Sequence, residues 1–85
     1  MLNGNEILMQ LADAAASVRI GNVYTHKKGG VYRVIGHGFD TELSRINVHY
    51  VREGGPDFNP AVDPLIIYDR PVFMWTEDRF TLVQD

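Results

Sequence analysis

The first part of the chain shows the hydrophobic pattern of an amphipathic helix, over residues 4–18. Its apolar side chains recur at spacings of three and four residues, which places them on one helix face. They are Ile7, Leu8, Leu11, Ala15 and Val18. Asn3 or Asn5 can accept a backbone N–H as the helix cap, and Glu6 complements the positive end of the helix dipole. We therefore expect an N-terminal helix within residues 1–20 that ends near Gly21.

The pattern changes to short strand-like segments from there on. Residues 21–36 predict a strand, a glycine turn and a second strand, and Gly36 and Gly38 then allow the chain to bend. Further strands are expected at residues 45–52, 65–68, 72–75 and 80–83, with a loop at 53–64. In the first of these, Ile46, Val48 and Tyr50 share one face, and Asn47, His49 and Val51 share the other. One helix and five or six short strands favour a mainly β domain, built as a small barrel or a strongly curved sheet.

Composition narrows the range of functions. A chain of 85 residues makes one domain, so the helix of residues 1–20 and the barrel of residues 21–85 are expected to share a core. The chain has no cysteine, which excludes disulfides, thiolate catalysis and cysteine-ligated zinc. The net charge of −3 argues against sequence-independent binding of duplex nucleic acid. Neither a basic leader nor a long apolar run is present, so we expect a cytoplasmic protein without a membrane partner.

A cationic turn at residues 26–30 is the first candidate for ligand contact. It consists of His26, Lys27, Lys28, Gly29 and Gly30. Two ammonium groups and an imidazole surround a glycine pair whose backbone N–H groups can face an anion. A solvated hairpin turn explains the same residue types and is the simpler interpretation, because lysines protect sheet edges and glycines supply positive φ.

Arg70, followed by Pro71, is the second candidate. An arginine near Tyr68 can stack on a base, or it can clamp a carboxylate or phosphate with two hydrogen bonds. Alternatively, it forms an internal ion pair that holds strand ends together. The possible acidic partners are Asp69, Glu42 and Asp40. We weigh the two interpretations equally.

The histidines and carboxylates give little support to metal binding or catalysis. His26, His37 and His49 lie at spacings that match no compact ligand motif, although His37 is expected on the strand face of Arg33. No serine lies in a recognisable nucleophile context, and no carboxylates are paired at a spacing that assigns an acid and a base. We therefore expect a non-enzymatic protein with no metal and no cofactor.

Aromatic side chains are abundant for so short a chain. Six of them are candidates for the core or for a stacking surface, namely Tyr24, Tyr32, Tyr50, Tyr68, Phe73 and Trp75. Most of them are expected in the core, because large aromatic rings dominate small cores. Tyr24 and Tyr68 are the expected exposed exceptions, because each adjoins a cationic motif.

The order of these motifs resembles that of the DUF1653-like domain, a small prokaryotic and phage family of unassigned function. The matching positions are Tyr24, His26, Lys28-Gly29, Tyr32, Thr41-Glu42, Tyr50, Tyr68, Arg70-Pro71 and Trp75. The resemblance covers residues 22–75, and Tyr68 stands where the family usually has tryptophan. The N-terminal helix and the loop at 53–64 lie outside the family pattern. The resemblance implies a small SH3-like β-barrel and no known catalytic residue.

Together these patterns favour a small binding module for an anionic ligand, such as a nucleotide or single-stranded nucleic acid. The expected ligand-binding residues are Tyr24, His26, Lys27, Lys28, Tyr68, Arg70 and Trp75. The alternative is a protein-interaction or homo-oligomerisation domain. Its contact surface would be the helix stripe formed by Ile7, Leu8 and Leu11.

Overall fold

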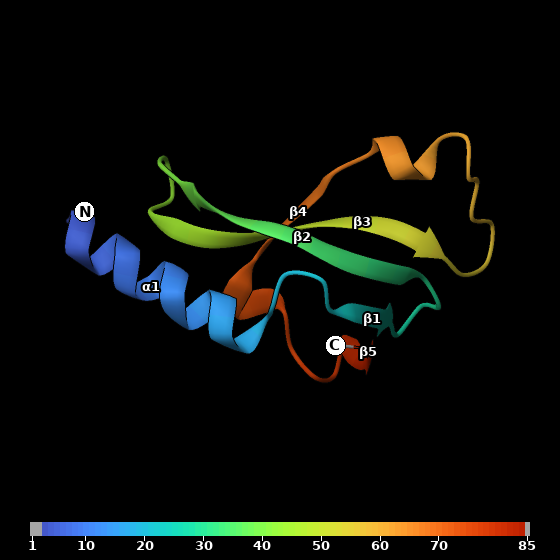
Figure 1. Ribbon diagram of the computed structural model, residues 1–85, viewed down its shortest axis with the longest axis horizontal. Coiled ribbons are helices and arrows are strands. Elements are labelled where there is room, and N and C mark those ends of the chain that lie inside the picture. Colours follow the sequence, from blue (N-terminus) through green and yellow to red (C-terminus); the bar gives the residue numbers. More distant parts are fainter. Residues whose placement is uncertain (1–2, 85) are drawn as a thin grey trace.

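The computed structural model describes residues 3–84 and contains one helix and five strands (Figure 1). The main elements are α1 (Gly4–Ser17), β1 (Val23–His26), β2 (Val31–Asp40), β3 (Arg45–Gly54), β4 (Tyr68–Pro71) and β5 (Phe80–Gln84). Two short 3-10 turns, η1 (Asp63–Leu65) and η2 (Val72–Met74), lie on either side of β4. The chain is therefore a small mixed α/β domain with an N-terminal helix and an antiparallel sheet.

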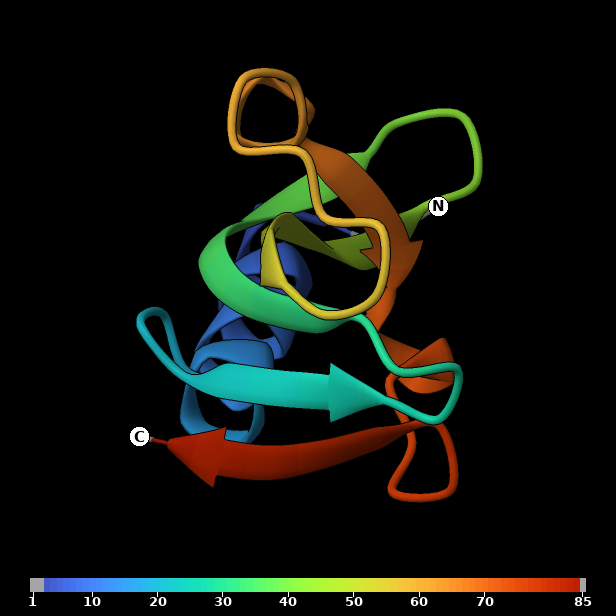
Figure 2. The same cartoon turned by 90° about the vertical axis from the view of Figure 1, so that its right-hand side faces the viewer.

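The sheet is open, with strand order β4-β3-β2-β1-β5. The long β2–β3 hairpin forms its centre, while β1 bridges β2 and β5. Figure 2 shows β1 and β5 side by side beneath the strongly curled β2. Within residues 3–84, β4 and β5 do not pair with each other, so the expected closure into a barrel is not formed. Pro71 ends β4 without a backbone N–H, and η2 then turns the chain before β5 begins.

Helix α1 begins at the cap that the sequence suggests. The Asn3 side chain accepts a hydrogen bond from the backbone N–H of Glu6 (2.9 Å) and donates one to the Glu6 carboxylate (2.9 Å). This reciprocal arrangement satisfies a backbone donor that the first helical turn leaves without a partner. Asn3, and not Asn5, is therefore the cap.

The buried face of α1 differs by one position from the predicted stripe. Ala14 and Val18 are buried, whereas Ala15 is exposed and Leu8 is 66% exposed. Ile7 and Leu11 are half-buried. The buried side chains follow the i, i+4, i+7, i+11 spacing of a single helix face, which Leu8 and Ala15 do not share. This face packs on β2 and β3.

Two side chains of β2 hold the connection between α1 and β1. His37 Nε2 donates to the Val18 carbonyl (2.6 Å), and the Arg33 guanidinium donates to the Gly21 carbonyl (2.7 Å). Gly21 has φ +95°, a conformation that glycine adopts without strain. The predicted common face of Arg33 and His37 thus binds the C-terminal end of the helix, and His37 has a structural role.

The core follows the predicted alternation of β3. Ile46, Val48 and Tyr50 are buried, and neither Val48 nor Val34 of the neighbouring strand has any exposed surface. Asn47, on the opposite face, is also buried. The core therefore lies mainly on the face of the β2–β3 hairpin that carries Val34, Val48 and Tyr50.

Two predicted strands are wrong. Residues 65–67 are exposed, with Leu65 at 81%, because η1 takes in Leu65 and β4 pairs with β3 only from Tyr68 onward. Residues 72–74 form η2 instead of a strand. The strand predicted at residues 80–83 is confirmed as β5. Among residues 3–84, no helix has the length and apolar character that crossing a bilayer requires.

Candidate anion-binding site

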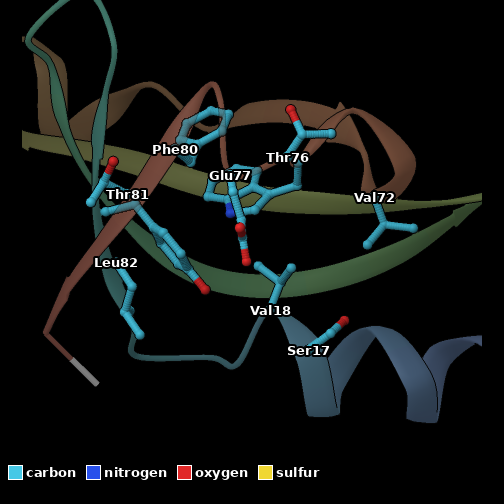
Figure 3. A pocket seen from close by; sticks show the side chains of 10 residues that line it. Ser17, Val18, Val72, Thr76, Glu77, Phe80, Thr81 and Leu82 are labelled. Carbon is cyan, nitrogen blue, oxygen red and sulfur yellow. The ribbon is translucent and has the colours of Figure 1, made fainter.

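The structure divides the predicted ligand-binding residues between two cavities. His26, Lys28, Tyr68 and Arg70 line a pocket of about 390 Å³, which we call the cationic pocket. Tyr24 and Trp75 line a different cavity, to which Phe80 also contributes. Figure 3 shows this second cavity from close by. Lys27 lines neither cavity and is exposed. The predicted surface is therefore not continuous.

Each wall of the cationic pocket comes from a different part of the chain. The end of β1 and the following turn supply His26, Lys28 and Gly30, and β2 supplies Tyr32. Strand β3 supplies Tyr50 and Arg52, and β4 supplies Tyr68 and Arg70. Pro56, Asp57 and Phe80 complete the lining. Its volume lies in the range, roughly 300–1,000 Å³, that is usual for small-molecule sites.

Arg70 contacts two aromatic side chains and has no acidic partner among residues 3–84. Its Nε donates to the Tyr50 hydroxyl (3.3 Å), and its Cζ lies 5.2 Å from the centre of the Phe80 ring. Among residues 3–84, no carboxylate lies within 4.0 Å of this guanidinium. The internal ion pair, one of the two interpretations of Arg70, is therefore absent from the described residues. Asp40 lies instead near Arg45 (3.8 Å), and Asp69 lies near His49 (3.7 Å).

Arg52 is a second pocket arginine, which the sequence patterns did not single out. Its Nε donates to the Gly54 carbonyl (3.0 Å), and its Nη2 donates to the Pro56 carbonyl. These neutral acceptors orient the guanidinium but leave its charge without a counterion among residues 3–84. A signal was present, because Arg52 continues the alternation of Ile46, Val48 and Tyr50 at the rim of the buried face.

His26 and Lys28 are held together by the cationic turn. The backbone N–H of Lys28 donates to His26 Nδ1 (3.1 Å), so the neutral ring carries its proton on Nε2. Burial lowers the pKa of His26 below its ordinary value of 6.5, and the positive charges of Arg70 and Lys28 lower it further. The imidazole is therefore kept as a neutral hydrogen-bond donor near neutral pH.

The charges around the pocket are unbalanced. Lys28, Arg52 and Arg70 line it together with a single carboxylate, that of Asp57. The whole chain carries a net charge of −3, so this excess of positive charge is local. Positive side chains in a concave site with low-dielectric walls attract anions more strongly than the same charges spread over a flat surface.

Three tyrosines form the inner wall of the pocket. The rings of Tyr50 and Tyr68 are stacked at 5.6 Å, and Tyr32 meets both rings edge-on at 5.3 and 6.0 Å. Burial raises the pKa of Tyr32, which keeps its hydroxyl protonated. Tyr68 is half-buried in the pocket wall. The expected exposure of Tyr24 is wrong, because Tyr24 is 6% exposed and packs against Trp75 and Phe80.

Two glycine turns pack together and fix the rim of the pocket. Gly29 has φ +102° and Gly55 has φ +98°, and Pro56 lies against Gly29. A Cβ atom on Gly55 would overlap the carbonyl oxygen of Gly29. This close approach joins the turn that carries Lys28 to the segment whose Pro56 carbonyl orients Arg52.

The remaining candidates for chemistry stay apart. In the part of the chain that the structure describes, no three side chains of His, Asp or Glu converge as a metal site would require. His37 binds the helix end, and His49 lies near Asp69.

Comparisons with known proteins add no family assignment. No family model matches the chain, and neither a curated protein nor a solved structure shows a significant match. The resemblance to the DUF1653-like domain therefore stays a prediction.

Replacing Gly55 by alanine should disrupt the pocket rim. The substitution places a side chain at positive φ and against the Gly29 carbonyl, so we expect it to lower the free energy of unfolding by about 2 kcal/mol or more. Gly36→Ala is the matched control, because a Cβ there meets no atom within 4 Å. Urea unfolding of both variants measures the difference. Equal stability of the two variants would contradict the close packing of the turns.

The lowered pKa of His26 predicts a loss of stability in mild acid. The unfolded chain, with a histidine pKa of about 6.5, binds a proton before the folded protein does. The contribution of His26 is therefore complete above that pH and is lost as the pH falls towards the folded-state pKa. In His26→Asn, an amide oxygen replaces Nδ1 as acceptor but does not titrate. Between about pH 7.5 and 5.5, the unfolding free energy of the wild type should fall further than that of this variant, and parallel curves would refute this role of His26.

Proposed function

We propose that the protein is a non-enzymatic binding module that holds a nucleotide in the cationic pocket. The observation that carries the proposal is the convergence of Arg52, Arg70 and Lys28 in one pocket without acidic ion-pair partners among residues 3–84. Positive side chains gathered in a concave site attract an anionic counterion. A phosphate group, with several acceptor oxygens, is the anion best matched to two guanidinium groups.

The aromatic wall supports a phosphate that carries a base. Tyr68 is half-buried in the pocket, and its ring offers a π surface near the cations. A purine or pyrimidine gains about 1–3 kcal/mol from stacking on an aromatic side chain. The neutral His26 adds a hydrogen-bond donor for a sugar or a phosphate oxygen.

The size and charge of the chain favour a single nucleotide over a long strand. A volume of about 390 Å³ suits one small ligand. A strand of nucleic acid needs a basic track that continues beyond the first phosphate. A chain with a net charge of −3 has no excess of basic residues from which to build such a track. Single-stranded nucleic acid is therefore the second choice as a source of the same phosphate chemistry.

We also propose that the curved sheet is an SH3-like barrel that is open between β4 and β5. Strands β1, β2 and β3 each pair with the strand that follows them, and β5 returns to pair with β1, which supports this assignment. The aromatic residues of the proposed DUF1653-like pattern lie in or next to the core. Such a barrel is a scaffold for many functions, so the functional proposal depends on the pocket alone.

A second candidate function uses the surface of α1. Leu8 is 66% exposed and Met9 is 68% exposed, while Ile7 and Leu11 are half-buried against the domain. Exposed apolar side chains on one helix are compatible with a protein contact or a homodimer. Light scattering of the wild type and of Leu8→Glu distinguishes this candidate, because only a helix-mediated dimer would dissociate on the substitution.

Nucleotide binding is tested by calorimetric titration with adenosine 5′-monophosphate, inorganic phosphate, adenosine and a short oligothymidylate. We expect the monophosphate to bind more tightly than phosphate or adenosine alone. Lys28→Ala and Arg70→Ala should each weaken binding by about ten- to a hundred-fold, since a hydrogen bond to a charged group contributes roughly 1.5–3 kcal/mol.

The matched control is Arg19→Ala, which removes the same charge from an exposed position that lines neither cavity. Its affinity should equal that of the wild type. Circular dichroism of each variant separates lost binding from lost folding. Absence of binding by all four ligands at millimolar concentration, or equal weakening by all three substitutions, would refute the proposal.

A further inference from the structure

The second cavity differs in character from the cationic pocket. Its volume is about 610 Å³, and its lining includes Val18, Tyr24, Val72, Trp75 and Phe80. Figure 3 shows Val18 and Ser17, at the end of α1, opposite Thr76 and Glu77. A smaller hollow shares Ser17 and Val72 with it and continues along α1. The two hollows together are called the apolar groove.

One wall of the apolar groove is a sheet edge that is open to pairing. Thr81 and Leu82 of β5 line the groove, and within residues 3–84 β5 pairs only with β1. Its residues 80–84, Phe-Thr-Leu-Val-Gln, contain neither a charge nor a proline. The opposite edge, β4, carries Asp69, Arg70 and Pro71. Charged residues and proline are the usual protection of an edge strand, so β4 is protected and β5 is not.

The groove also contains a hydrogen-bond donor without an acceptor. Trp75 Nε1 is buried and has no partner among residues 3–84. A buried donor left in this state costs about 1–3 kcal/mol. Because Nε1 is covered in the unbound protein, a peptide along β5 reaches it only if the Trp75 ring shifts. An extended peptide then offers a carbonyl acceptor at every residue.

The charges that line the apolar groove are all acidic. Glu77 lies at the cavity and Asp13 at the hollow along α1, while no lysine or arginine lines either part. A second copy of the chain would bring the same acidic groups and an edge strand without a basic residue. Charge complementarity therefore favours a basic partner over self-association.

From these features we propose that β5 and the apolar groove bind an extended segment of a partner protein. The segment adds a strand to β5, inserts apolar side chains into the groove, and directs lysine or arginine side chains towards Glu77 and Asp13. This site is separate from the cationic pocket and does not depend on nucleotide binding.

The test uses a synthetic, end-capped peptide of sequence Lys-Ser-Val-Thr-Val-Ser-Lys. In an extended chain its two valines and two lysines share one face. The protein has a single tryptophan, Trp75, so the emission of that side chain reports directly on the groove. We expect a saturable emission shift with the lysine peptide and at least a tenfold weaker response to the same peptide with glutamate in place of lysine.

Two variants of the full chain make the test specific. Glu77 is exposed, so Glu77→Lys should fold normally and weaken binding of the lysine peptide by about fivefold or more. Glu53→Lys reverses a charge that lines neither part of the groove and should leave this affinity unchanged. Amide hydrogen exchange should show new protection confined to one edge of β5.

Three results would overturn the proposal. The first is an unchanged Trp75 emission with the lysine peptide at millimolar concentration. The second is equal affinity for the lysine and glutamate peptides. The third is a concentration-dependent dimer whose formation protects the amides of β5, because a second copy would then be the occupant of the edge.

Discussion

The packing of side chains around the Phe80 ring joins the sheet to both cavities. The ring centres of Tyr24, His26, Tyr32, Tyr50 and Trp75 lie between 3.8 and 6.5 Å from that of Phe80. These residues come from β1, β2, β3 and the segment before β5, so one ring contacts most of the sheet. In a chain of this size few other large side chains are buried, and aromatic contacts supply much of the apolar surface that folding removes from water.

The same ring lines two cavities of opposite charge. Arg70 lies over Phe80 in the cationic pocket, and Trp75, which lines the second cavity, stacks on Phe80 at an interplanar angle of 5°. Aromatic surface behind a cation lowers the local dielectric and strengthens its attraction for an anion. The apolar groove uses Tyr24 and Trp75 of the cluster, with Glu77 as its charged group. A thin core thus leaves one aromatic cluster to serve as the wall of both sites.

Local chemistry made part of this structure predictable. The Asn3 cap, the alternation of Ile46, Val48 and Tyr50, and the strand that begins at Phe80 all depend on short-range patterns, and all are confirmed. The spacing of apolar residues in α1 predicts burial at Ala15, one position from the buried Ala14, because spacing alone does not fix which side of a helix meets the sheet. The composition of residues 65–67 predicts a buried strand, yet β4 pairs with β3 only from Tyr68 onward.

The candidate site was less predictable, because it depends on how distant segments meet. Local motifs alone predict four ligand-binding residues that line one pocket, namely His26, Lys28, Tyr68 and Arg70. The partition of Tyr24 and Trp75 into another cavity follows from the position of Phe80, which no local pattern reveals. Arg52 lines the pocket because the carbonyl groups of Gly54 and Pro56 accept hydrogen bonds from its guanidinium and orient it. Contacts of this kind are set by turn geometry.

The most direct test of anion binding in the cationic pocket observes the arginine side chains themselves. The Nε–Hε signals of a ¹⁵N-labelled sample can be followed by NMR during a titration with adenosine 5′-monophosphate. We expect the signals of Arg52 and Arg70 to shift together and saturate with one dissociation constant, while that of Arg33, paired with Glu53, stays fixed. Equal, non-saturating shifts of all the arginines, or a response from Arg33 alone, would contradict an anion site in the cationic pocket.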